Sequence, residues 1–324
     1  MDLTWIAALL VAVVGQPGSA PSTPDLPTGP PPAVAYAFAE HRTFGGGDWL
    51  LVRPDGGSRR PFSESLGEFV AYDDVVVNGY GTEGGFEVEL FDGRPHLEHE
   101  QGGLCHYGLV VTPDRGEVAY LQNDGSLVEQ YADGSLSTRP VELPGGPCTG
   151  AQPVALRGPK LYVDAPGTPP SVIAGPNHPN ALRGFLDLAD VSARGLLVGR
   201  LADDKHCSGL LRPTHGIRWR TCADRLVAFS PDGHHVLGTL AGPEPRGVVV
   251  HHTRTGGIAA SWPSAPRQRI TQVEWEDDGH VLIVVHRREV GWSVVRLGVD
   301  GSAEYAVTPV RTGGEFPPFR LQLS

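Results

Sequence analysis

The amino-acid sequence predicts an all-β fold, a seven-bladed β-propeller in which four-stranded antiparallel blades form a ring. Three observations predict it. The 324 residues include 43 Gly and 30 Pro, which are poor in helix interiors and common in turns. A strand–turn–strand unit recurs along the chain. Its copies are spaced by about 41 residues, within the roughly 40–45 expected for one four-stranded blade.

The recurring unit is clearest in residues 226–239. Two apolar segments there flank the sequence Ser-Pro-Asp-Gly at 230–233. Pro presets the first turn position, Asp bonds the nearby backbone and Gly accepts a positive φ, so this sequence predicts a tight turn. Residues 107–120 and 273–285 carry the same pattern. With three weaker copies included, the second strands of the units are marked by Val76, Val118, Leu161, Leu197, Val236 and Leu282.

Six such units and an N-terminal remainder give seven blades. An open ring would expose two strand edges, so we expect a closing pair. Residues 318–323 alternate apolar and polar side chains, and we expect them to pair with residues near 34–42. The N- and C-terminal strands would then complete one blade with the hairpin that begins at 49–56. Rings of six or eight blades are alternatives, because the unit at 152–179 is short and Pro-rich. The rival architecture is a two-domain β-sandwich.

The turn at 230–233 and its partial copy at Pro113-Asp114 resemble the blade motif of TolB-like and WD40-like propellers. That group includes exported bacterial proteins of unassigned activity. No Gly-His or Trp-Asp pair stands in the WD40 register, which favours the TolB-like comparison. The resemblance implies a scaffold for protein or small-ligand contacts, with no catalytic residue to carry over.

The N-terminus is typical of an exported chain. Residues 3–14 form an apolar run that is shorter than the roughly 20 residues needed to cross a bilayer as a helix. We therefore assign residues 1–20 to a signal peptide or short membrane anchor, 21–33 to a Pro-rich linker and 34–324 to the propeller. A buried N-terminal core segment is the alternative. We expect the linker to be extended or disordered, without buried apolar surface.

Four cysteines accompany this export pattern: Cys105, Cys148, Cys207 and Cys222. An even number in an exported chain indicates two disulfides. Of the three connectivities, we favour Cys105–Cys148 and Cys207–Cys222, which keep each bridge within neighbouring units. A zinc site with His106 and His206 is the alternative, but no C-x-x-C or H-x-x-x-H spacing accompanies them.

Motifs for catalysis, metals and cofactors are missing from the sequence. It has no G-x-S-x-G elbow, phosphate-binding loop or dinucleotide fingerprint. The acidic run at 274–278 lacks the spacing of a calcium loop. The adjacent histidines at 234–235 and 251–252 point to opposite faces of a strand, so neither pair is expected to share a ligand. We predict no catalytic residue, no metal and no cofactor.

The formal net charge of -11 argues against nucleic acid as a partner, since phosphate binding needs clustered Lys and Arg. We expect a monomeric, extracytoplasmic module, secreted or tethered through its N-terminus, that binds a protein, peptide or glycan. The alternative is an enzyme, such as a lyase, hydrolase or cyclase, with its site in the central channel. That alternative requires His, Asp or Glu side chains from at least three blades to converge there.

Overall fold

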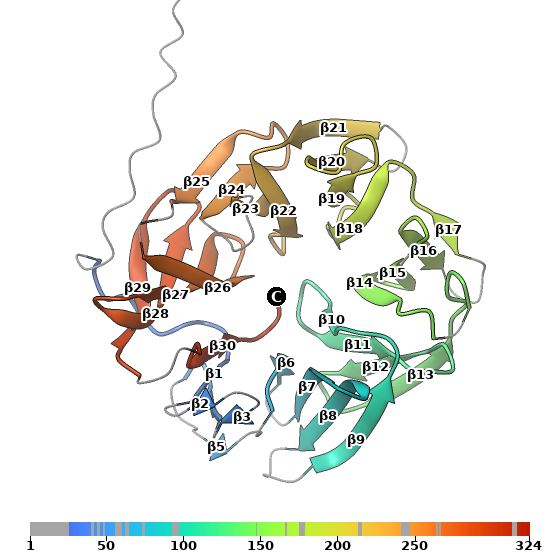
Figure 1. The fold of residues 1–324 in the computed structure, drawn as a ribbon, viewed down its shortest axis with the longest axis horizontal. Coiled ribbons are helices and arrows are strands. Elements are labelled where there is room, and N and C mark those ends of the chain that lie inside the picture. The colour runs from blue at the N-terminus through green and yellow to red at the C-terminus, as the bar shows by residue number, and fades with distance from the viewer. Residues whose placement is uncertain are drawn as a thin grey trace, which may run out of the picture.

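The computed structural model describes residues 26–324, except 40–41, 44–45, 48, 56–59, 62–64, 73–74, 93–96, 147, 166, 175–178, 213–215, 241–246, 264, 266 and 313–315. The described strands form seven four-stranded antiparallel sheets around a central channel, together with one small hairpin (Figure 1). The fold class is therefore confirmed: the chain is a seven-bladed β-propeller. The expected export segment, residues 1–20, lies outside the described residues. Among those residues, no helix is long and apolar enough to cross a membrane.

Each blade runs from an innermost strand at the channel to an outermost strand at the rim, and is given in that order. Blade 1 contains β30 (Phe319–Leu321), β1 (Tyr36–Phe38), β4 (Leu50–Val52) and β5 (Arg60–Pro61); blade 2 contains β6 (Glu68–Ala71), β7 (Val75–Thr82), β8 (Gly85–Asp92) and β9 (Leu97–Leu104); blade 3 contains β10 (Val110–Val111), β11 (Glu117–Leu121), β12 (Ser126–Tyr131) and β13 (Leu136–Pro140).

The remaining blades follow the same order. Blade 4 contains β14 (Gln152–Arg157), β15 (Lys160–Asp164), β16 (Ser171–Ala174) and β17 (Asn180–Ala181); blade 5 contains β18 (Phe185–Val191), β19 (Leu197–Leu201), β20 (Ser208–Arg212) and β21 (Gly216–Thr221); blade 6 contains β22 (Asp224–Phe229), β23 (His235–Leu240), β24 (Val248–His252) and β25 (Ile258–Trp262); blade 7 contains β26 (Gln268–Trp275), β27 (His280–Arg287), β28 (Gly291–Gly298) and β29 (Ala303–Val310). The small hairpin joins β2 (Arg42–Thr43) to β3 (Gly46–Gly47).

The ring closes as the sequence predicts. Strand β30 pairs antiparallel with β1, and Phe319 lies opposite Phe38. The Phe319 ring also packs against the rings of Tyr36 and Phe38, at centroid distances of 6.2 and 5.4 Å. All six residues that marked second strands lie in the second strand of their blade. Blade 1 is thus built from both ends of the chain, which leaves no open edge between first and last blade.

Side-chain hydrogen bonds stabilise the Ser-Pro-Asp-Gly turn of blade 6. Ser230 donates from Oγ to Asp232 Oδ1 (2.6 Å), and the same carboxylate oxygen accepts the His234 N–H (2.9 Å). Gly233 has a φ of +70°, which a side chain would strain. The turn joins β22 to β23, as predicted.

The core lies between neighbouring blades. In β27 the five residues Val281 to Val285 are all buried, whereas a strand with one wet face would alternate. Middle strands are sandwiched between sheets on both sides, so both faces need apolar side chains. The largest fully buried side chains include Trp49, Trp275 and Trp292. This packing fixes the innermost strands, and with them the channel.

The structure contains the two expected disulfides. Cys105–Cys148, with Cα atoms 5.2 Å apart, joins the segment before blade 3 to the segment before blade 4. Cys207–Cys222, at 4.1 Å, joins the two ends of the β20–β21 hairpin within blade 5. Each bridge stays within one blade or its neighbours.

The Pro-rich segment departs from expectation. Leu26 is 7% exposed and packs in the core cluster of blades 6 and 7, and Thr28 forms a parallel bridge with Tyr305 of β29. The Arg296 guanidinium donates to the carbonyls of Pro30 and Pro31 at 3.1 and 3.0 Å. The expectation that the linker buries no apolar surface is therefore wrong for residues 26–33. A buried cation on blade 7 satisfies carbonyl groups that proline-rich backbone cannot pair internally.

Candidate functional site

In blades 3 to 7 the turns that join first to second strands lie on one side of the ring, which we call the turn face. Turns of blades 3 to 7 surround a depression of about 980 Å³ at the channel mouth, lined by residues that include Asp114, Gly158, Ala193, Asp232 and Asp278. Because each turn belongs to a hairpin, the sequence of its unit decides which residue reaches the mouth: an acidic residue in blades 3, 6 and 7, and Gly158 or Ala193 in blades 4 and 5.

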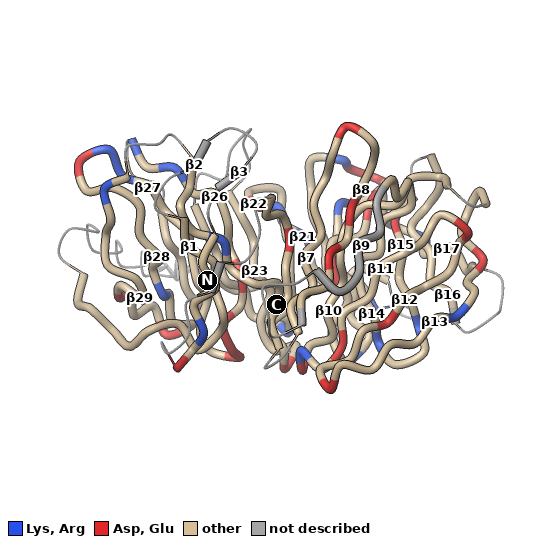
Figure 2. The backbone as a smooth tube through the Cα atoms, turned by 90° about the horizontal axis from the view of Figure 1, so that it is seen from below, with Lys and Arg blue, Asp and Glu red and all other residues tan. Residues whose placement is uncertain are grey.

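Four carboxylates make this mouth acidic: Asp114, Glu117, Asp232 and Asp278. They come from blades 3, 6 and 7. Within the described part of the chain, none of the four has a basic side chain at ion-pair distance. Figure 2 shows Asp and Glu positions gathered along the lower edge of the ring, on both sides of its middle. Arg157 also lines the depression, but its ion pair is with Asp190, so the depression carries an excess of acidic groups.

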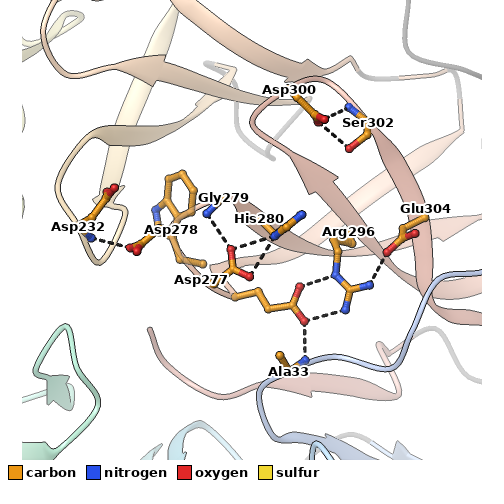
Figure 3. A network of polar contacts seen from close by, with 12 residues as sticks. Ala33, Asp232, Asp277, Asp278, Gly279, His280, Arg296, Asp300, Ser302 and Glu304 are labelled. Atoms are coloured by element: carbon orange, nitrogen blue, oxygen red, sulfur yellow. Dashed lines mark hydrogen bonds and ion pairs between the residues drawn. The ribbon is translucent and has the colours of Figure 1, made fainter.

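Hydrogen bonds within and between turns hold these carboxylates. Asp114 accepts the Gly116 N–H at 3.1 Å, and Asp278 of blade 7 accepts the Asp232 N–H of blade 6 at 2.8 Å (Figure 3). The Thr112 hydroxyl and the Gly116 N–H lower the pKa of Asp114, so it is ionised at neutral pH. The rim is thus charged and preorganised before any ligand arrives.

Glu117 differs from the other three acids. Burial and the nearby charge of Glu129 raise its pKa to about 7, against the partial opposing effect of Arg139. Near neutral pH this carboxyl is divided between its neutral and ionised forms. A cation bound in the depression would favour the ionised form.

Arg115 links the two sides of the mouth. It lies in the blade 3 turn with a φ of 55°. Its guanidinium donates to the carbonyls of Trp275 and Glu276 in blade 7, at 2.7 and 3.1 Å. In Figure 1 the loop after β10 reaches toward the centre of the ring, beside the C-terminus. Arg115 therefore bonds across the mouth, and both of those acceptors are backbone carbonyls.

A second basic residue, Arg157, holds the channel wall. It donates to Asp190 (3.1 Å) and to the Val191 carbonyl (2.6 Å) in blade 5, while Asp190 accepts the Phe229 N–H of blade 6 (2.7 Å). One partly buried ion pair thus joins three consecutive blades. Its role is to fix the inner strands that carry the turns.

The C-terminus enters the channel. The Leu323 N–H donates to the Phe69 carbonyl at 2.9 Å, and the Ser324 hydroxyl donates to Glu274 Oε2 at 2.9 Å. Burial raises the pKa of Glu274 to about 7. A cavity of about 160 Å³ beside these residues has a mainly apolar lining, which includes Val154, Ala189, Val227, Asp190 and Arg157.

Carboxylates from three blades, Glu68, Asp190 and Glu274, lie along the inner strands, each accepting hydrogen bonds from neighbouring protein groups. Those bonds hold blades or the C-terminus in place. Among the described residues, one group of three candidate metal ligands occurs, Asp204 with Cys207 and Cys222, and both sulfurs are in the disulfide.

Two features of the site were not predicted from the sequence. Arg115 was part of a recognised unit, but nothing in the sequence showed that its turn reaches blade 7. The alternation of side chains along one strand separates adjacent histidines, and a ligand shared by histidines of several blades was the alternative, whereas β23 and β24 place His235 directly opposite His252 within one blade. A cross-strand register of the two segments would have found that second pair.

No protein-family model and no curated protein matches the sequence. Solved structures with the same architecture do. U3-55K gives a TM-score of 0.54 at 12% identity, over 88% of this chain and 87% of its own. The dihydro-heme d1 dehydrogenase NirN, in complex with DHE, gives 0.51 at 15%, over 90% and 77%. The β-propeller domain of Myceliophteria thermophila Cps50 (Swd1) gives 0.51 at 11%, over 77% and 87%.

A putative TolB from Agrobacterium tumefaciens also matches, with a TM-score of 0.46 at 10% identity, over 70% of this chain and 93% of its own. At these identities the likeness concerns the fold. The propeller fold that the TolB-like and WD40-like resemblance implied is confirmed by the strand order itself: this chain is a seven-bladed β-propeller of four-stranded antiparallel blades, closed by its two ends.

Proposed function

We propose that this propeller is an extracytoplasmic binding module whose turn-face depression takes a basic segment, rich in Arg or Lys, of a partner protein. One observation carries the proposal: four carboxylates from three blades line a depression of about 980 Å³ without a described ion pair among them. A cationic segment would supply the missing partners, and complementary charge would speed its association.

The size and rigidity of the site suit a peptide. A depression of this volume is at the upper end of small-molecule sites, and it is wide enough for several side chains. The rim is held by hydrogen bonds, so little conformational entropy is lost when a ligand binds. Two disulfides support an oxidising compartment. The membrane tether, the monomeric state and a glycan ligand stay predictions.

The test is a titration of the full chain with a labelled Arg/Lys-rich peptide, followed by fluorescence anisotropy. We expect binding that weakens as salt rises, because exposed charges are screened. The triple variant Asp114→Asn, Asp232→Asn and Asp278→Asn should lose about 2 kcal/mol, or about 30-fold in affinity, from three partly exposed charges. Asn keeps the turn hydrogen bonds, so the fold should persist.

A matched control has the same charge change elsewhere. Asp124, Asp133 and Asp300 each accept a backbone N–H two residues on, as Asp114 does. They belong to outer turns, which join second to third or third to fourth strands, and none of the three lines the depression. The triple Asn variant of these three should bind as the wild type does. Equal losses in the two triple variants, or no binding of the basic peptide, would overturn the proposal.

A further inference from the structure

Two histidines of blade 6 face each other across adjacent strands. His235 of β23 and His252 of β24 are register partners, so their side chains lie on the same face of the sheet. The Thr253 N–H donates to the His234 carbonyl at 3.0 Å. Hydrogen-bonded and non-hydrogen-bonded pairs alternate along antiparallel strands, which makes the His235–His252 pair the non-hydrogen-bonded kind, with the closer side chains.

The ring geometry fits a shared ligand. The two imidazole centroids are 5.1 Å apart and the ring planes are inclined at 45°. His235 Nδ1 is buried without a hydrogen-bond partner, while His252 is exposed to solvent. A buried ring nitrogen without a partner costs free energy unless something binds it. One side of the pair is thus open to an incoming ion, and one nitrogen lacks a ligand.

The other two histidines of this region are already engaged. His251 points into the opposite face, where its ring nitrogens bond Asp224 (3.0 Å) and the Gly256 carbonyl (2.9 Å). His234 bonds Arg194 at 2.8 Å. Only the cross-strand pair therefore combines proximity, solvent access and an unpartnered nitrogen among these four.

The charges around the pair also suit a metal ion. The carboxylates of Asp232 and Asp278 are close enough to act electrostatically on His235, and their negative charge favours a cation at this position.

We propose that His235 and His252 form a two-histidine site for a divalent transition-metal ion, with zinc as the representative. Each imidazole supplies one nitrogen, and water completes the coordination. Imidazole suits zinc, copper and nickel, whereas calcium and magnesium prefer oxygen ligands. The site borders the turn-face depression through Asp232 and Asp278, yet it does not depend on the proposed peptide function.

The test is calorimetric titration of the untagged full chain with zinc chloride under non-reducing conditions. We expect one ion per chain, and affinity lowered about tenfold or more in each of His235→Asn and His252→Asn. His280→Asn is the control, because His280 is a similarly accessible histidine of the next blade, held by Asp277 at 2.9 Å. That variant should bind zinc as the wild type does, and magnesium should bind none of the four proteins at this site.

A second measurement tests the proposal even if the His235→Asn variant does not fold. Substoichiometric copper(II) should broaden the NMR signals of His235 and His252 most strongly among the 13 histidines of the wild type, and the His235 signal should stay sharp in the folded His252→Asn protein. The proposal is overturned if zinc does not bind at about 100 µM. It is equally overturned if His252→Asn binds zinc with wild-type affinity.

Discussion

Replacing Arg296 by Met should destabilise the protein and release the N-terminal segment. Arg296 is 7% exposed and donates to both carboxylate oxygens of Glu276, which is 3% exposed, and to Glu304 (Figure 3). Met fills the space of the alkyl chain but leaves the Glu276 charge buried without its partner. Breaking a buried pair in this way costs about 3–5 kcal/mol.

Urea denaturation followed by tryptophan fluorescence measures that loss. Amide exchange measures the local effect, because the Gly29 N–H donates to the Tyr305 carbonyl and the Tyr305 N–H donates to the Pro27 carbonyl. Both amides should exchange faster in Arg296→Met. Adding Glu276→Gln should restore much of the lost stability, since the uncompensated charge is then removed. A loss below about 1 kcal/mol with unchanged exchange at Gly29 would refute the reasoning.

Three further predictions concern the pH dependence, the disulfides and the ring closure. Glu117 has a folded pKa near 7 and an ordinary value of 4.5, so its ionisation favours unfolding. The stability of Glu117→Gln relative to the wild type should therefore rise between pH 5 and pH 8, measured as the difference in Tm. An equal Tm difference at pH 5 and pH 8 would contradict this. Removing the Cys207–Cys222 disulfide, which spans 15 residues, should lower the free energy of unfolding in urea by about 3 kcal/mol. Removing Cys105–Cys148, which spans 43 residues, should lower it by about 4 kcal/mol. The reverse order would count against a loop-entropy origin. Phe319→Ala should cost about 3–5 kcal/mol, because the ring is 2% exposed in the closing blade; a loss under about 1 kcal/mol would show that closure does not depend on it.

The fold was predictable because its signals are local. The turn at Ser230 to Gly233 uses its own side chains, and the six second-strand residues lie where hydrogen bonding within each hairpin puts them. The closing strand was also predictable, because Phe319 to Leu321 alternate as a strand and an open edge is costly.

The site was less predictable because it depends on contacts between distant blades. Arg115 and Trp275 are 160 residues apart, and Arg296 reaches Pro30 across 266. Nothing in the local sequence of either arginine identifies its acceptors. Composition alone predicts no buried apolar surface in the Pro-rich segment. Leu26 and Pro32 are nevertheless buried, and the Arg296 guanidinium binds the carbonyls of Pro30 and Pro31.

The central claim is that the acidic turn face binds the partner. Hydrogen–deuterium exchange of the full chain, with and without the Arg/Lys-rich peptide, tests it most directly. We predict protection in the turns at residues 112–117, 230–235 and 276–280, which surround the depression and its metal-binding edge. Protection confined to the outer turns at 124–126 and 300–302, or none in the three mouth turns, would contradict the account.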